Sequence, residues 1–208
     1  MATVKLEENL KLESGWLCLD FANTVEWHLS DHPVEGLTSY AALIAWARTI
    51  NLLPDRIAQQ LLRAADQHPT EAARVLDRAV ALREAIYHLF SAVASGRSPA
   101  AEDQATFNSE LSRSMAKSCL VWNKANFDWG RQGEDGDLDQ VLWWVLRSAT
   151  DLLTSEDVKR VGVCADDRGC GWLFYDTSRN RTRQWCSMRG CGNRAKARRH
   201  YEKVKSEE

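Results

Sequence analysis

Four of the six cysteines lie in the last 45 residues of this 208-residue chain, and their spacing constrains its fold more than any other feature. Cys164 and Cys170 form one close pair, and Cys186 and Cys191 form a second pair after fifteen intervening residues. Two close cysteine pairs at such a separation are typical of a structural zinc site with one knuckle at each pair. We therefore predict that these four cysteines bind one structural Zn²⁺.

Other states of the four thiols stay open at this point. The pairs enclose five and four residues rather than the commonest two, so the match to the usual zinc motif is imperfect. An iron–sulfur cluster also takes soft thiolate ligands, and disulfides or free thiols are a further alternative. The remaining cysteines, Cys18 and Cys119, lie beside apolar residues and are expected to be buried free thiols.

The sequence around the four cysteines predicts a small metal-bound module. Residues 171–175 are typical of a strand, residues 178–180 of a turn and residues 183–185 of a return strand, so we expect a hairpin between the two cysteine pairs. Strong helix formers follow Cys191 without a breaker. Knuckle, hairpin and helix make a treble-clef-like zinc finger, which is too small to hold a core without its metal.

The chain before this module has the periodicity of a helical body. Apolar residues recur at helical spacing in segments near 16–28, 39–51, 54–62, 70–95, 99–118 and 138–153. Residues 120–122 and 127–129 are instead rich in strand formers on either side of a turn, and they predict a small β-hairpin. The predicted fold class is α+β but mostly α, with a helical domain over residues 1–158 and a zinc finger over residues 159–208.

Charge is unevenly distributed along the chain. Residues 164–208 carry 11 Lys and Arg against 6 Asp and Glu, a net charge of +5, whereas the preceding residues carry 16 against 23, a net charge of −7. A cationic end on an acidic body indicates a polyanionic partner for that end alone. A basic helix that is merely solvated is the plainer alternative.

The cationic side chains gather on the predicted hairpin and on the C-terminal helix. A helix with cations on both flanks can contact phosphates while its end approaches base edges. The candidate nucleic-acid-binding residues are Arg179, Arg181, Arg183, Arg189, Asn193, Arg194, Lys196, Arg198, Arg199 and Lys203. We expect the stripe formed by Ala197, Tyr201 and Val204 to face the hairpin, because these residues share one side of the helix.

Two stretches of sequence resemble known families. The finger segment contains Cys191-Gly192-Asn193-Arg194 and resembles the CGNR zinc finger, which is named for this motif. The stretch Leu17-Cys-Leu-Asp-Phe-Ala-Asn-Thr24 is similar to the opening of the ABATE domain, which precedes this finger in proteins described as stress-induced transcription regulators of bacteria. The resemblance implies a DNA-binding role for the finger, and it implies no particular ligand or reaction for the body.

The polar residues of the N-terminal motif have two interpretations. Asp20, Asn23 and Thr24 lie in an apolar segment, where they could bind a small-molecule effector or form a buried network that supports the fold. The sequence contains no glycine-rich phosphate loop, no Gly-x-Ser-x-Gly elbow and no His-Glu-x-x-His motif, so we expect no enzymatic activity. No signal peptide and no apolar run long enough for a membrane span is present, so we expect a cytoplasmic protein without membrane contact.

Three functions stay open on the sequence. The first is a transcription regulator whose finger binds duplex DNA while the body senses a ligand or mediates self-association, for example as a homodimer. The second is an RNA- or ribosome-associated zinc protein, because a basic aromatic surface also suits single strands. The third is an enzyme of unknown reaction whose zinc module is purely structural.

Overall fold

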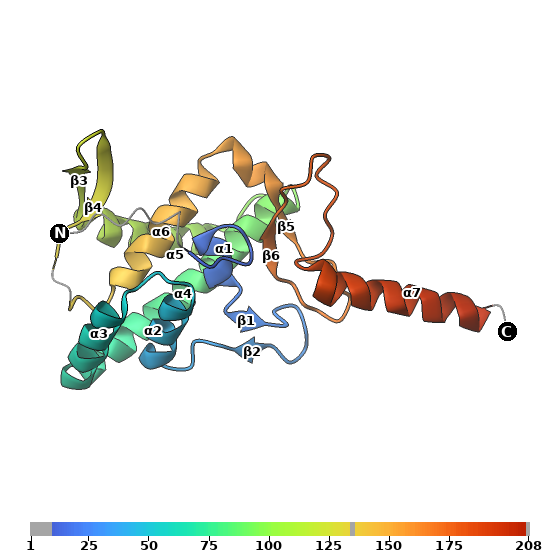
Figure 1. Ribbon diagram of the computed structural model, residues 1–208, viewed down its shortest axis with the longest axis horizontal. Coiled ribbons are helices and arrows are strands. Elements are labelled where there is room, and N and C mark those ends of the chain that lie inside the picture. The colour runs from blue at the N-terminus through green and yellow to red at the C-terminus, as the bar shows by residue number, and fades with distance from the viewer. Residues whose placement is uncertain (1–9, 134–135, 207–208) are drawn as a thin grey trace.

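Helices make up most of the body, as the sequence predicts. The structure, a computed structural model, describes residues 10–133 and 136–206 (Figure 1). The helices of the body are, in chain order, α1 (Leu17–Ala22), α2 (Tyr40–Thr49), α3 (Asp55–Gln67), α4 (Pro69–Ala94), α5 (Ala101–Ala116) and α6 (Gln140–Leu153), followed by the short 3₁₀ turn η1 (Glu156–Arg160). The predicted fold class, mostly α with small sheets, is confirmed.

The long helix α4 organises the core. It starts at Pro69, a position where the missing N–H of proline removes no hydrogen bond within the helix. It ends at Ala94, with Ser95 as its C-cap before Gly96, whose φ is +63°. Its buried residues recur every three or four positions from Ala72 to Leu82, whereas neighbouring residues are buried in its second half, where the helix is enclosed on more than one side. The short helix α1, all six of whose residues are buried, packs against both α4 and α6.

The described part of the chain also contains three small antiparallel sheets. They pair β1 (Val25–Glu26) with β2 (Val34–Glu35), β3 (Ser118–Trp122) with β4 (Phe127–Arg131), and β5 (Val161–Val163) with β6 (Leu173–Tyr175). The β3–β4 pair is the hairpin predicted for the body. No helix in the described part of the chain is long and apolar enough to cross a membrane.

The hairpin of the finger differs from the prediction in its pairing. Strand β6 pairs with β5, which precedes the first cysteine pair, and residues 183–185 form no strand. The Asp176 carboxylate explains the difference, because it accepts the backbone N–H groups of Ser178 at 2.7 Å and Arg183 at 3.0 Å and so holds the following segment as a loop. The hairpin therefore encloses the first knuckle and does not connect the two knuckles.

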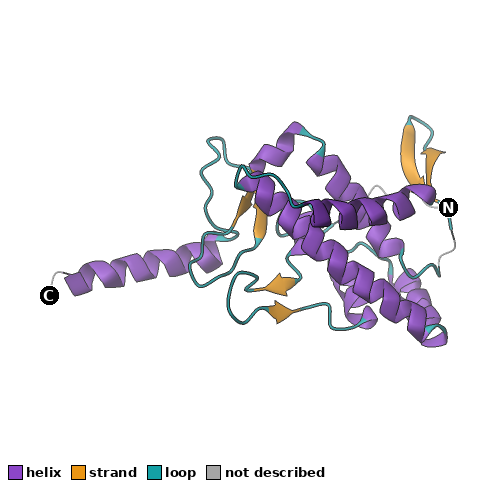
Figure 2. Cartoon of the chain, turned by 180° about the vertical axis from the view of Figure 1, so that it is seen from behind, coloured by secondary structure: helices purple, strands orange, loops and turns teal. Residues whose placement is uncertain are grey.

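The C-terminal helix projects from the body. The single turn η2 (Met188–Gly192) leads into α7 (Asn193–Ser206), which extends away from the other helices (Figures 1 and 2). Tyr201 is 69% exposed and Val204 is 45% exposed, so the expectation that their stripe packs against the hairpin is wrong. The hairpin lies against the body instead, where β5 contacts α4 and β6 contacts α1.

Candidate metal centre and nucleic-acid interface

The four cysteine sulfur atoms converge on one point. The Sγ atoms of Cys164, Cys170, Cys186 and Cys191 all lie within 4.8 Å of one another. Cys186 Sγ is 3.7 Å from Cys170 Sγ and 3.6 Å from Cys191 Sγ. Tetrahedral ligands at a Zn–S distance of about 2.3 Å would be about 3.8 Å apart, so the spacing fits a single zinc ion.

The same distances exclude the disulfide alternative. A disulfide joins two sulfurs at about 2.05 Å, and all four thiols are free in the structure. A cluster of several iron atoms would hold the cysteine sulfurs further apart than this arrangement does. The prediction of one structural zinc site is therefore confirmed, and four sulfur ligands make it a closed site without a position for a substrate.

Close backbone contacts with the body shape the first knuckle. Gly169 has a φ of +86°, and a Cβ atom there would lie 2.5 Å from Ser30 N. The backbone N–H groups of His28 and Leu29 donate to the carbonyl oxygens of Cys170 at 3.1 Å and Gly169 at 3.0 Å. Residues 25–30, which we call the strap, thus lie directly on the knuckle, and only glycine leaves room for this approach.

Arg194 supports the metal centre from the start of α7. Its Nη2 donates to Cys191 Sγ at 2.8 Å and to Asp166 Oδ2 at 2.9 Å, and its guanidinium lies over the Trp27 ring of the strap. Burial alone would raise the pKa of the Asp166 carboxyl, but the Arg168 N–H and the Arg194 guanidinium hold this pKa below its usual range. Arg194, a candidate phosphate contact on sequence grounds, thus has partners within the finger, although its side chain is 40% exposed.

Arg194→Ala is expected to weaken zinc binding. Removal of a hydrogen bond to a metal ligand typically costs 10- to 100-fold in metal affinity, so we expect the zinc dissociation constant to rise by about 10-fold or more. Competition with a chromogenic chelator measures this change. Lys196→Ala is the matched control, because Lys196 is exposed on the same helix, and equal zinc affinity of the two variants would contradict a role for Arg194 at the metal.

Two further candidate arginines also have partners within the finger. Arg183 donates to the carbonyl oxygens of Tyr175 at 3.1 Å and Trp185 at 2.8 Å and to that of Cys186, so it ties β6 to the second knuckle. Arg198 forms an ion pair with Asp167, and its Nε lies 3.7 Å from Glu202 Oε1. The carboxylates partly neutralise the charge of Arg198, whereas the carbonyl oxygens occupy the donors of Arg183 and leave its charge in place.

Several other candidate cations are exposed. Four of them are exposed, and their side chains make no hydrogen bond or ion pair with a described residue, namely Arg179, Arg181, Arg189 and Lys196. The Arg199 guanidinium lies over the Trp185 ring, 5.6 Å from its centroid, and Lys203 is exposed near the end of α7. The Asn193 side chain donates to the Arg189 carbonyl oxygen at 3.4 Å. The exposed charge therefore lies on α7, on the second knuckle and on the loop after β6.

A groove of about 780 Å³ lies at the root of α7. Arg183, Trp185 and Arg199 line the side formed by the finger, and Ala94 and Ser95 at the end of α4 line another part. Sequence reasoning missed the contribution of α4, because no local pattern relates residues 94–95 to a helix that starts 99 positions later. The cationic surface of the finger is therefore concave at this groove, where the Trp185 ring forms part of the wall.

Asp20 and Asn23 form a buried network that joins the body to the finger. Asp20 accepts the backbone N–H groups of Glu13 at 2.9 Å and Ser14 at 2.8 Å. The Asn23 amide donates to Leu173 O at 2.8 Å and to Ser14 Oγ at 2.7 Å, and its Oδ1 accepts Leu173 N–H at 2.8 Å. Thr24 stays local, since its hydroxyl donates to Phe21 O. The structure places all three side chains in internal hydrogen bonds.

Tyr87 and Trp172 add further contacts between the body and the finger. Trp172 Nε1 donates to Val25 O of the strap at 3.1 Å, and the Tyr87 hydroxyl donates to Gly171 O at 3.1 Å. Tyr87 also stacks on the His28 ring, with 3.7 Å between their centroids. Tyr87 lies at helical spacing in α4, which only indicates a core position, so its contact with the zinc finger follows from the tertiary structure alone.

Comparison with known proteins gives two matches that together span most of the chain. A family model named ABATE and described as "Putative stress-induced transcription regulator" matches residues 15–156. The model of the CGNR zinc finger matches residues 160–204. None of the curated proteins matches the chain.

Proposed function

Because this chain belongs to the ABATE family and carries a CGNR zinc finger, we propose that it regulates transcription by binding duplex DNA through the finger. The observation that carries the proposal is the exposed charge around the metal centre. The zinc ion and the internal arginines hold a rigid frame, and the cations without internal partners project from it. A preorganised set of cations can contact phosphates without a large ordering cost.

The shape of α7 favours duplex DNA over other polyanions. The helix has 14 residues, which corresponds to a length of about 21 Å, and it stands clear of the body (Figure 2). The major groove of B-DNA is about 12 Å wide and admits one α-helix. A helix that projects with basic residues on both flanks can enter this groove without a collision between the acidic body and the phosphates.

The two alternative functions, an RNA-associated protein and an enzyme, would use other features of the structure. An RNA- or ribosome-associated protein would use Trp185 and Arg199 in the groove to stack on unpaired bases. An enzyme would need a reactive group outside the metal centre, because four sulfur ligands fill the zinc coordination sphere. Our proposal includes no catalytic activity.

For the body we propose self-association as its part in regulation, in preference to ligand sensing. Asp20 and Asn23, the candidate ligand-binding residues, are engaged in internal hydrogen bonds. A pocket in the body beside Arg78 and Glu110 holds only about 10 Å³, which leaves room for no more than one water molecule. Neither feature offers space for a small-molecule effector in this conformation.

Salt-dependent binding to matched duplex DNA, single-stranded DNA and RNA tests the proposal. We expect the duplex to bind most tightly, with log affinity falling linearly with log salt by about 0.9 per phosphate contact. The double variant Arg189→Ala/Lys196→Ala should reduce this slope by roughly two and weaken binding by about 10-fold at moderate salt. Fluorescence anisotropy with labelled oligonucleotides at several salt concentrations provides both quantities.

The control replaces two exposed arginines on the body. Arg63→Ala/Arg74→Ala alters α3 and α4 away from the finger and should leave both the affinity and the slope unchanged. If the finger variant bound like the wild type, the cationic surface would not be the binding site. Tighter binding of RNA or of single strands than of the duplex would favour the second function over the first.

A further inference from the structure

The β3–β4 hairpin presents an apolar face to solvent. In its register Leu120 is paired with Trp129, and Trp122 is paired with Phe127, so alternation places all four side chains on the same face. Their exposed fractions are 61% for Leu120, 57% for Trp122, 63% for Phe127 and 37% for Trp129. The Trp122 and Phe127 rings are in edge-to-face contact, with 5.1 Å between their centroids. We call these four residues the hairpin face.

The hairpin face is large for a surface that stays in water. With about 150–250 Å² for each aromatic side chain, the exposed fractions of the three aromatic residues correspond to roughly 240–390 Å² of apolar surface, and Leu120 adds to this area. That is within the range of the largest patch on a typical monomer, which is often a functional site. A two-stranded sheet is also marginal by itself, so a long exposed hairpin with an apolar face indicates a partner that covers it.

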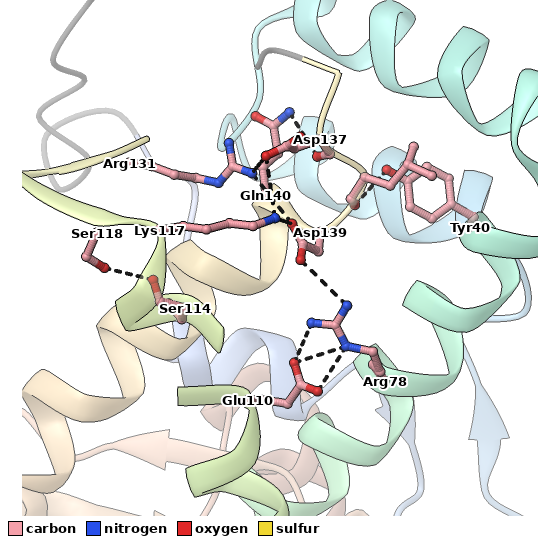
Figure 3. Close-up of polar contacts among 11 residues, drawn as sticks. Tyr40, Arg78, Glu110, Ser114, Lys117, Ser118, Arg131, Asp137, Asp139 and Gln140 are labelled. Carbon is pink, nitrogen blue, oxygen red and sulfur yellow. Dashed lines mark hydrogen bonds and ion pairs between the residues drawn. The ribbon is translucent and has the colours of Figure 1, made fainter. Parts of the chain in front are cut away.

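Ion pairs at the base of the hairpin hold it in place (Figure 3). Lys117, just before β3, donates to Asp139 at 2.9 Å, and Arg131 at the end of β4 is paired with Asp137 and with Asp139. Arg78 of α4 forms ion pairs with both Glu110 of α5 and Asp139. Its Nη2 lies 2.7 Å from Glu110 Oε2, and its Nη1 lies 3.5 Å from Asp139 Oδ2. These contacts connect both strands to the helices of the body.

Hydrogen bonds fix the two ends of the strand pair as well. Trp143 Nε1 of α6 donates to the Ser118 hydroxyl at 2.9 Å, and the Asn123 side chain accepts the N–H groups of Ala125 and Asn126 within the turn. A hairpin held at both its base and its turn loses little conformational entropy when a partner binds. The apolar face is therefore preorganised for docking.

We propose that the hairpin face is the contact surface between two copies of this chain. An isologous interface of standard size buries about 800 Å² on each partner, with a core that is about 65% apolar. The hairpin face supplies an apolar core of that order. None of its four side chains is ionised, although the Arg147 guanidinium lies over the Trp129 ring, 4.8 Å from its centroid. Residues 1–163 have a net charge of −7, so two bodies repel each other, and an interface centred on uncharged side chains does not add to this repulsion.

The position of the hairpin also suits a dimer. It lies at the end of the molecule opposite to α7, so a contact between two hairpins leaves both basic helices free (Figures 1 and 2). Dimeric regulators bind two half-sites of DNA, one with each subunit. The inference rests on the self-association that we propose for the body, but it does not require that the finger binds DNA.

The oligomeric state of the full-length zinc-loaded protein tests the inference without nucleic acid. Sedimentation equilibrium and light scattering from about 1 to 100 μM should show a monomer–dimer equilibrium for the wild type. Two hot-spot residues each contribute a factor of about 30 or more, so Trp122→Ser/Phe127→Ser should weaken dimerisation by at least roughly 100-fold. Circular dichroism and the zinc content establish that this variant is folded.

Two further variants sharpen the result. Leu120→Lys places like charges opposite each other across a two-fold interface and should also yield a monomer, which keeps the test valid if the double variant fails to fold. Tyr201→Ser removes an equally exposed aromatic ring from α7 and should leave the dimer intact.

Two outcomes would overturn the inference. The first is a wild type that is monomeric at 100 μM, including one that binds lipid vesicles instead. The second is a wild-type dimer that survives the Trp122→Ser/Phe127→Ser and Leu120→Lys variants. DNA binding is measured separately on a single half-site, where a monomeric variant should bind as well as the wild type. A monomer that binds the half-site would refute the dimer surface alone, and a dimer that binds no nucleic acid would refute the DNA-binding function alone.

Discussion

Cys186→Ser is expected to abolish zinc binding and to unfold the finger. Cys186 Sγ lies within 3.7 Å of the sulfur atoms of both Cys170 and Cys191, so its loss removes one of the four ligands of the tetrahedral site. Structural zinc contributes about 10–16 kcal/mol to the folding of small zinc modules near pH 7. The apolar residues around the cysteines cannot replace this contribution, because they consist mainly of a few partly buried tryptophans.

Zinc analysis and hydrogen exchange with mass spectrometry measure the result. The zinc content should fall from one to zero per chain, and amide protection should be lost in residues 164–172 and 176–206 and also in the strap, whose N–H groups donate to the first knuckle. Strand β6 should keep its protection, because it pairs with β5 and packs against the body. Helices α4 and α6 should stay protected, because their core is a separate cluster. Cys119→Ser is the control, and a metal-free Cys186→Ser protein with wild-type protection of the finger would contradict the zinc assignment.

Asn23→Ala is expected to destabilise the protein by about 3 kcal/mol and to loosen the finger from the body. The substitution removes three hydrogen bonds and leaves the backbone N–H and C=O groups of Leu173 without these partners. Each buried polar group without a partner costs about 1–3 kcal/mol. Because a change of 1 kcal/mol corresponds to roughly 2–4 °C for a chain of this size, the melting temperature should fall by about 6–12 °C.

Thermal unfolding followed by circular dichroism measures this change in zinc-loaded protein. Asn108→Ala is the matched control, because Asn108 is exposed on α5 and its replacement should shift the melting temperature by little. If Asn23 served a ligand and not the fold, the two variants would have the same stability. Hydrogen exchange at Leu173 should rise in Asn23→Ala but not in the control.

Much of the fold could be predicted from local sequence patterns. Helix α4 could be predicted because apolar residues recur at every third or fourth position in its sequence, which is the spacing of one helix face. The β3–β4 hairpin is visible for a similar reason, since strand formers flank a turn around Asn123. The cysteine spacing predicts the metal because four thiolates in two close pairs suit the coordination of zinc.

Contacts between distant segments could not be predicted from local sequence patterns. The sequence suggested that residues 183–185 return as a strand, but Asp176 holds that segment as a loop and β6 pairs with β5. The stripe that includes Tyr201 has the spacing of a packed face, yet it is exposed, because the hairpin lies against the body. A periodic pattern shows that a face exists and leaves open which element covers it.

The sequence by itself determined the four zinc ligands, the mostly helical body and the uneven distribution of charge. These properties depend on the identity and spacing of neighbouring residues, which local geometry converts directly into helices, turns and knuckles. Only the tertiary structure decided that Arg183 and Arg194 support the finger, that Asn23 joins it to the body and that the hairpin face stays exposed. Those roles depend on which distant groups meet in space, because a charge or an amide acts on whatever partner the fold brings within hydrogen-bond distance.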